Sequence, residues 1–177
     1  SPPLRRGGLG WGYLTRRKMM NNTKFIEKLL DGVDVEWRAL GSLGDLVRGN
    51  GLQKKDFTES GVPAIHYGQI YTYYGLSTTE TKSFVSLDLA KQLKKVDQGD
   101  VVITNTSENL EDVCKAVAWL GGSDIVTGGH SIVVRHHQNA KYLSYYFQTL
   151  DFFQRKRAYV HGTKVMEIKK DDRSEER

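Results

Sequence analysis

The chain has 177 residues, 38% of them apolar and 27% charged, which predicts one folded domain with an appended arm. The formal net charge of +5 favours an anionic partner such as nucleic acid, although many basic proteins bind none. No apolar run approaches the roughly 20 residues needed to cross a bilayer, and the single cysteine excludes an internal disulfide. We therefore expect a cytoplasmic protein without membrane contacts, in which Cys114 is buried and inert.

The amino-terminal part of the chain divides at about residue 20. Residues 1–20 are rich in Gly, Pro and Arg and carry no acid, so we expect a flexible extension, either a tag or upstream sequence. Residues 21–30 then predict a helix with Asn22 as its N-cap, and residues 35–40 alternate like a strand. Residues 43–47 predict a short extended or helical piece before a glycine-rich turn.

The middle and end of the chain alternate short strands with helices. A strand is predicted over residues 62–70, a helix over 86–96, and a helix capped by Asn139 over 140–157. Four further strands are predicted at residues 101–104, 116–120, 125–127 and 131–135. This order predicts an α+β fold with a bent mixed β-sheet, barrel-like, and flanking helices. Residues 169–177 are almost wholly charged and predict a tail or the start of a helix.

Motifs that carry catalysis are missing from the sequence. There is no phosphate-binding glycine loop, no His-Glu-x-x-His and no Gly-x-Ser-x-Gly. Asp100, Glu167 and Lys169 can be forced into a nuclease pattern, but such short matches arise by chance in most sequences. The neighbouring His136 and His137 would point to opposite faces of a strand, so they would not share a metal. We expect no enzyme activity, no metal and no cofactor.

Polar and aromatic side chains gather instead where the predicted strands end. Lys54 and Lys55 follow a glycine turn, from which lysines can reach phosphates. The segment GVPAIHYGQIYTYYG brings four tyrosines and a glutamine out of the predicted strand 62–70, and we expect about half of them to line the core. Glutamine can read an adenine edge, and tyrosine hydroxyls contact phosphates or bases. Loops on a rigid scaffold are where such recognition residues concentrate.

The series "LLDGVDVEWRALGSLGDLVRGNGLQKKDF", "GVPAIHYGQIYTYYG", "GDVVIT", "DIVTGGHSIVVRH", "NAKYLSYYFQT" and "VHGTKVMEI" resembles the target recognition domain of a type I restriction–modification specificity (S) subunit. The resemblance implies such a domain over residues 21–168. S subunits carry two of these domains on long helices, and each domain reads one half of a split duplex DNA site. Modification subunits methylate adenine with S-adenosylmethionine, and a restriction subunit cleaves. The S subunit itself is not an enzyme and holds no cofactor.

The resemblance also implies site residues and leaves one alternative open. It implies that Lys54 and Lys55 hold phosphates. The first-choice DNA contacts are Tyr67, Gln69, Tyr71 and Tyr74, and the second choices are His130, His161, Thr163 and Lys164. The family continues into a long helix, whereas here the chain runs into KKDDRSEER, so we expect a truncated spacer helix. The alternative is a truncated subunit that acts as a protein-interaction or dimerisation module without reading DNA itself.

Overall fold

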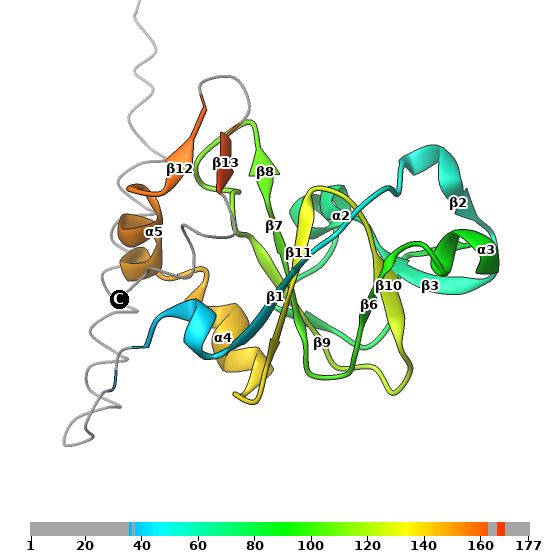
Figure 1. The fold of residues 1–177 in the computed structure, drawn as a ribbon, viewed down its shortest axis with the longest axis horizontal. Coiled ribbons are helices and arrows are strands. Elements are labelled where there is room, and N and C mark those ends of the chain that lie inside the picture. Colours follow the sequence, from blue (N-terminus) through cyan, green and yellow to red (C-terminus); the bar gives the residue numbers. More distant parts are fainter. Residues whose placement is uncertain (1–35, 37, 163–165, 169–177) are drawn as a thin grey trace, which may run out of the picture. The chain divides into compact units, whose positions relative to one another are not determined.

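The computed structural model describes residues 36, 38–162 and 166–168, whose ribbon is coloured in Figure 1. Apart from Glu36, these residues belong to one folding unit that begins at Trp37. The predicted extension 1–20, the predicted helix 21–30 and the charged segment 169–177 lie outside the described residues.

The first sheet is built on two strands that are buried on both faces. β7 (Val101–Thr104) and β9 (Ala116–Trp119) are buried at every position, because their apolar runs serve two cores at once. β11 (Ser131–His136) pairs antiparallel with β7, and β1 (Gly44–Arg48) pairs antiparallel with β11. β4 (Ser77–Thr78) adds a parallel edge to β9, which makes the sheet mixed.

Alternation along these strands separates the two cores. Val101, Ile103 and Ile132 face helices α4 (Ala140–Tyr146) and α5 (Leu150–Lys156), which contribute Leu143, Phe147 and Phe152 to the same cluster. Val102, Val117 and Val133 face the opposite way and pack with Ile65, Ile70 and Ile125. Successive strand residues point to opposite faces, so one apolar run fills both clusters. At about 25 cal/mol per Å² of apolar surface, this burial is the main stabilising term of the fold.

The second sheet packs over the Val102 face and carries a core of its own around Leu52 and Val85. Its strand order is β2 (Phe57–Thr58), β5 (Ser83–Val85), β3 (Val62–Ile65), β10 (Ile125–Thr127) and β6 (Lys94–Val96). β10 pairs parallel with β3, and the other pairings are antiparallel. A third sheet of β12 (Val160–His161), β13 (Met166–Ile168) and β8 (Thr106–Ser107) lies beyond the end of β7 (Figure 1).

The predicted α+β class with bent mixed sheets is confirmed, and in the described part of the chain the sheets do not close into a barrel. The predicted strands at β7, β9, β10 and β11 are confirmed, and residues 43–47 prove to be extended, as β1. The N-cap at Asn139 is also confirmed, since its side chain accepts from the Tyr142 backbone N–H at 3.0 Å.

Four predicted elements were wrong in type or length. The predicted strand 62–70 ends at Ile65, and α2 (Tyr67–Thr72) follows it. The His66 Nδ1 accepts from the Gly68 N–H at 3.1 Å, and the Gln69 side chain accepts from the His66 N–H at 3.2 Å, so side chains at both ends of the first turn start a helix. The sequence alternates like a strand, but these local hydrogen bonds prevail.

The remaining corrections concern helices. The predicted helix 86–96 is a single turn, α3 (Leu87–Ala90), capped by Ser86, and its last three residues form strand β6. The predicted helix 140–157 is two helices, because Thr149 caps α5 and accepts from the Phe152 N–H. Of the predicted strand 35–40, residues 35 and 37 lie outside the described residues, Glu36, Arg38 and Ala39 belong to no strand, and a 3-10 turn, η1 (Leu40–Ser42), follows.

Candidate nucleic-acid interface

An open pocket of about 370 Å³ lies where three loops of the two large sheets meet. Its lining comes from the turn after β1, the start of α2 and the turn before β11: Gly51, Leu52, Gln53, Lys54, His66, Tyr67, Gly129 and His130. Each of these loops follows or precedes a strand with a buried apolar face. The pocket therefore sits on a rigid base, as recognition sites commonly do.

Close backbone contact between two glycine turns shapes the pocket. The Gly129 N–H donates to the Gly51 carbonyl at 2.8 Å, and the Gly49 N–H donates to the Ser131 carbonyl at 2.9 Å. A Cβ on Gly128 would lie 2.1 Å from the Leu52 Cβ, which no side chain can accommodate. The pairing of β1 with β11 brings these turns together, so the pocket is a product of long-range sheet pairing.

Backbone strain also concentrates here. Three non-glycine residues of the described chain have φ in the left-handed region, and two of them, Leu52 at +57° and His130 at +62°, line the pocket. Such residues cost about 1–2 kcal/mol each and persist where the surrounding structure fixes them. Strained residues cluster at ligand sites, so this pair makes the pocket a candidate site.

Three of the residues that line the pocket carry aromatic rings: His66, Tyr67 and His130. Tyr67 contacts His66 with ring centroids 4.5 Å apart, and it contacts His130 with centroids 4.9 Å apart. Behind them, Phe57 meets His66 edge to face at 5.5 Å. Planar rings of this kind can lie against a sugar or a base.

The electrostatics of the pocket suit an anion or a hydrogen-bond acceptor. None of the eight described residues that line it is acidic, and Lys54 is exposed at its rim. Burial lowers the pKa of His66, and the nearby Lys54 and His130 lower it further, so His66 is neutral at neutral pH. The nearest turn acid, Asp56, accepts from the Gln53 backbone N–H at 2.7 Å and so caps its own turn.

The side chains of α2 and of the two residues that follow it are divided between surface and core. Tyr67 and Tyr71, four residues apart, share one face with centroids 6.1 Å apart. Ile70 and Tyr74, also four apart, lie in the core, and the Tyr74 hydroxyl accepts from the Lys82 N–H at 2.8 Å. Gln69 is buried too, and its amide donates to the Ser83 hydroxyl at 2.6 Å. Gln69 and Tyr74 therefore hold the helix in place instead of facing solvent.

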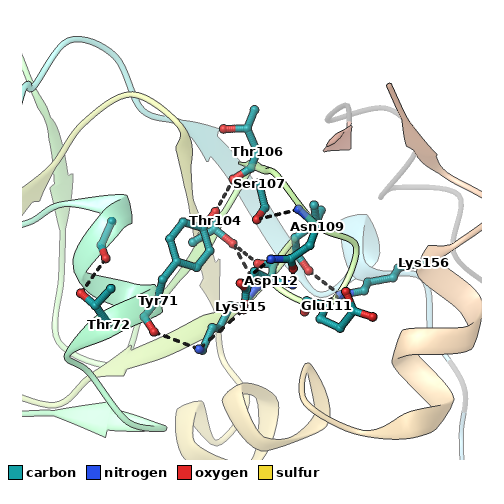
Figure 2. A network of polar contacts seen from close by, with 12 residues as sticks. Tyr71, Thr72, Thr104, Thr106, Ser107, Asn109, Glu111, Asp112, Lys115 and Lys156 are labelled. Carbon is teal, nitrogen blue, oxygen red and sulfur yellow. Dashed lines mark hydrogen bonds and ion pairs between the residues drawn. The ribbon is translucent and has the colours of Figure 1, made fainter. Parts of the chain in front are cut away.

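A polar network ties α2 to the loop between β7 and β9 (Figure 2). The Tyr71 hydroxyl donates to the Thr106 carbonyl, and the Lys115 ammonium donates to the Tyr71 carbonyl at 3.1 Å. From the other side, the buried Lys156 of α5 donates to the Glu111 carbonyl at 3.1 Å. Burial raises the pKa of Tyr71, which keeps this hydroxyl a proton donor. The loop is thus fixed from both ends.

The structure gathers some of the predicted site residues and separates others. Lys54, Tyr67 and His130 meet at the pocket, and Lys55 is exposed beside Lys54 in η2 (Lys54–Asp56). His161 is exposed on β12 and pairs with Glu167 of β13, which pairs in turn with Thr106 of β8. His161 therefore lies two strand spacings, about 10 Å, from β8. Thr163 and Lys164 lie outside the described residues.

Sequence reasoning left Gln53, His66 and Thr106 out of the predicted site. Gln53 lines the pocket next to Lys54, and Thr106 contacts His130. The glycines at 49, 51, 128 and 129 were the signal that the two turns can approach closely, but the sequence does not show that they meet.

Comparisons show a fold shared with known proteins. The structure described as "Structural basis underlying complex assembly and conformational transition of the type I R-M system" is 19% identical, with a TM-score of 0.55 over 92% of this chain and 41% of that chain. The HsdS subunit from Thermoanaerobacter tengcongensis is 17% identical, with a TM-score of 0.50 over 88% of this chain and 42% of that one. The Type-I restriction-modification S subunit from M. genitalium is 15% identical, with a TM-score of 0.48 over 80% and 33%.

The expected likeness to S subunits is therefore confirmed at the level of the fold, and the chain spans less than half the length of each of these three chains. No protein-family model matches the chain, and neither does any curated protein. In the described part of the chain, no helix is long and apolar enough to cross a membrane.

Proposed function

We propose that this chain binds duplex DNA sequence-specifically and reads one half of a split site for a type I restriction–modification complex. The observation that carries the proposal is the pocket, where Lys54, Tyr67 and His130 converge on strained, tightly packed turns and the described lining residues include no acid. A lysine supplies attraction to phosphate, while the rings and Gln53 supply hydrogen bonds and flat surface for a groove.

Charge supports the same proposal. Lys54 and Lys55 are adjacent and exposed, and the whole chain carries +5. Lysines that neutralise phosphates release counterions, which gives affinity without sequence preference. Sequence preference then has to come from contacts with base edges, and among the side chains that line the pocket His130 and Gln53 are exposed and carry hydrogen-bonding groups.

The proposed role is binding without catalysis. Within the described residues, no group of three His, Cys, Asp or Glu side chains could hold a metal ion. The fold is shared with S subunits, and in a type I system the modification and restriction subunits would supply methylation and cleavage. These subunits are the protein partners that we propose, together with double-stranded DNA.

Selection from a random duplex pool tests the proposal. The chain is immobilised, bound duplexes are amplified over several rounds, and the enriched pool is sequenced. We expect a short motif of about three to five base pairs, the share of one domain in a split site. Enrichment of no motif would contradict the proposal and would favour the protein-interaction alternative. A parallel selection with Tyr67→Ala, which removes the central ring, is expected to lose the motif.

A further inference from the structure

His130 is presented to solvent by a turn that leaves its backbone little freedom. Its carbonyl accepts from the Asn105 N–H at 2.8 Å, which ties the turn to the end of β7. On either side, the Ser131 hydroxyl donates to the Gly128 carbonyl at 2.6 Å, and the Gly129 N–H is bonded to Gly51. These contacts hold His130 in the left-handed conformation, so its side chain leaves the turn in one direction.

The imidazole ring is oriented by a second hydrogen bond. The Thr106 hydroxyl lies 2.9 Å from the His130 Nδ1, and Tyr67 covers one side of the ring. Thr106 is 8% exposed, so its hydroxyl hydrogen needs an acceptor inside the protein. Nδ1 is that acceptor if the ring carries its proton on Nε2. The contact then fixes both the orientation and the tautomer of the ring.

Thr106 is itself held on two sides. Its carbonyl accepts from the Tyr71 hydroxyl of α2, and its strand β8 pairs with β13 at Glu167. Tyr71 shares its helix face with Tyr67, which contacts the same imidazole. Tyr67, Tyr71, Thr106 and His130 therefore form a closed ring of contacts from three separate segments.

We infer that His130 is a base-reading residue and that Thr106 is the positioning residue that makes it specific. Held by Thr106, the imidazole presents Nε2–H as a single donor, and its partner is a purine N7 in the major groove, the acceptor that guanine and adenine share. Lys54, on the same pocket, anchors a phosphate and sets the register. This inference rests on the proposed function and names the chemistry by which that site discriminates.

The test compares Thr106→Val with Thr106→Ser on the duplex recovered by selection. Valine keeps the shape of threonine but removes the hydroxyl, whereas serine keeps the hydroxyl. We expect Thr106→Val to bind the selected duplex about fivefold to tenfold more weakly and to bind a shuffled duplex as the wild type does. Thr106→Ser should retain most of the wild-type affinity for the selected duplex. Replacement of one purine of the motif by its 7-deaza analogue should weaken DNA binding by the wild-type protein by a similar factor. The same replacement should leave DNA binding by Thr106→Val almost unchanged.

NMR spectroscopy can measure directly whether Thr106 fixes the tautomer of the His130 ring. In protein with ¹⁵N-labelled histidine, the His130 nitrogen shifts should report the Nε2–H tautomer in the wild type and in Thr106→Ser. In Thr106→Val they should report a mixture of tautomers. A change of this kind would not follow from a loss of stability alone.

The outcomes separate this inference from the proposed function. The inference is overturned, and the proposed function stands, if selection returns a motif but two results follow. Thr106→Val binds the motif as tightly as the wild-type protein does, and the wild-type protein binds every 7-deaza duplex as tightly as the unmodified one. If selection returns no motif, both are overturned. A motif, a loss with valine, a rescue with serine and one sensitive purine together support the inference.

Discussion

The rings of Tyr67 and His130 contact each other with centroids 4.9 Å apart, although one starts helix α2 and the other precedes strand β11. The contact exists because β3 and β10 pair in parallel and so end at the same edge, which places the segments that follow them together. Two residues that could each be an ordinary turn side chain thus become the centre of a pocket with Lys54 at its rim.

Removal of the rim lysine should weaken DNA binding without changing sequence preference. Lys54→Ala deletes one cation from the pocket, so affinity should fall by a similar factor for all duplexes. The slope of log affinity against log salt should decrease by about 0.9, the counterion release of one phosphate contact. Fluorescence anisotropy at several salt concentrations measures both. Lys141→Ala, an exposed lysine on α4, is the charge-matched control and should leave the slope unchanged.

Replacement of His130 by glycine should separate stability from function. Glycine adopts the left-handed conformation without strain, so relief at φ +62° offsets the lost ring contacts. We expect the free energy of unfolding to stay within about 1 kcal/mol of the wild type. Specific DNA affinity should fall about tenfold, because a base contact is lost. Urea unfolding and anisotropy measure the two quantities, and a large loss of stability together with full affinity would contradict the assignment of His130.

Stability should depend on pH through His66. Its folded pKa is lowered from 6.5 mainly by burial, so the unfolded chain binds more protons as the pH falls below neutrality. The contribution of neutral His66 to the free energy of unfolding is fully present above about pH 7, and it is lost as the pH falls through 6.5 toward the pKa of the folded state. His66→Asn keeps an N-cap acceptor for Gly68 but does not titrate, so stability should change less between pH 8 and pH 5.

Urea unfolding at several pH values measures this difference. His136, whose pKa is also lowered mainly by burial, contributes a pH dependence of the same sign, and this part should remain in His66→Asn. An equal pH dependence in His66→Asn and the wild type would show that His66 is not the group responsible.

The close approach of the two turns should make Gly128 intolerant of a side chain. Alanine there would place its Cβ 2.1 Å from the Leu52 Cβ and 3.0 Å from the Gly51 carbonyl oxygen. We expect a loss of about 1–3 kcal/mol in unfolding free energy, with weaker DNA binding because the pocket opens. Gly122→Ala is the control, since a Cβ there meets nothing within 4 Å. Thermal unfolding of the two variants measures this difference, and equal melting temperatures would contradict the close packing of Gly128 against Leu52.

Strands with unbroken apolar runs were predictable from the sequence, and helices set by side-chain caps were not. β7 and β10 are bounded by turns and consist of aliphatic residues followed by one threonine, so their length and type follow from pattern alone. In residues 62–70, the apolar and aromatic residues suit a strand, and the helix is decided by hydrogen bonds of His66 and Gln69. The apolar stripe of residues 140–157 likewise conceals the cap at Thr149 that divides it.

The candidate site was only partly predictable, because local sequence shows which residues lie at turns but not which turns meet. Lys54, Tyr67 and His130 were predicted as DNA contacts from their place at turns and strand ends and from the resemblance to S subunits, and the structure brings them together. Gln69 and Tyr74 lie inside because helical spacing, not strand alternation, decides which side chains of this segment reach the surface. The role of Thr106 depends on a contact between distant segments, and no local pattern carries it.

Chemical-shift mapping with the selected duplex tests the central claim most directly, because it reports binding and its location together. ¹⁵N-labelled protein is titrated with the duplex recovered by selection and, separately, with a shuffled duplex. We expect the largest changes at residues 51–54, 66–67 and 129–130, and we expect them to be larger with the selected duplex. Changes that centre on another surface, or no changes with either duplex, would contradict the proposed DNA interface.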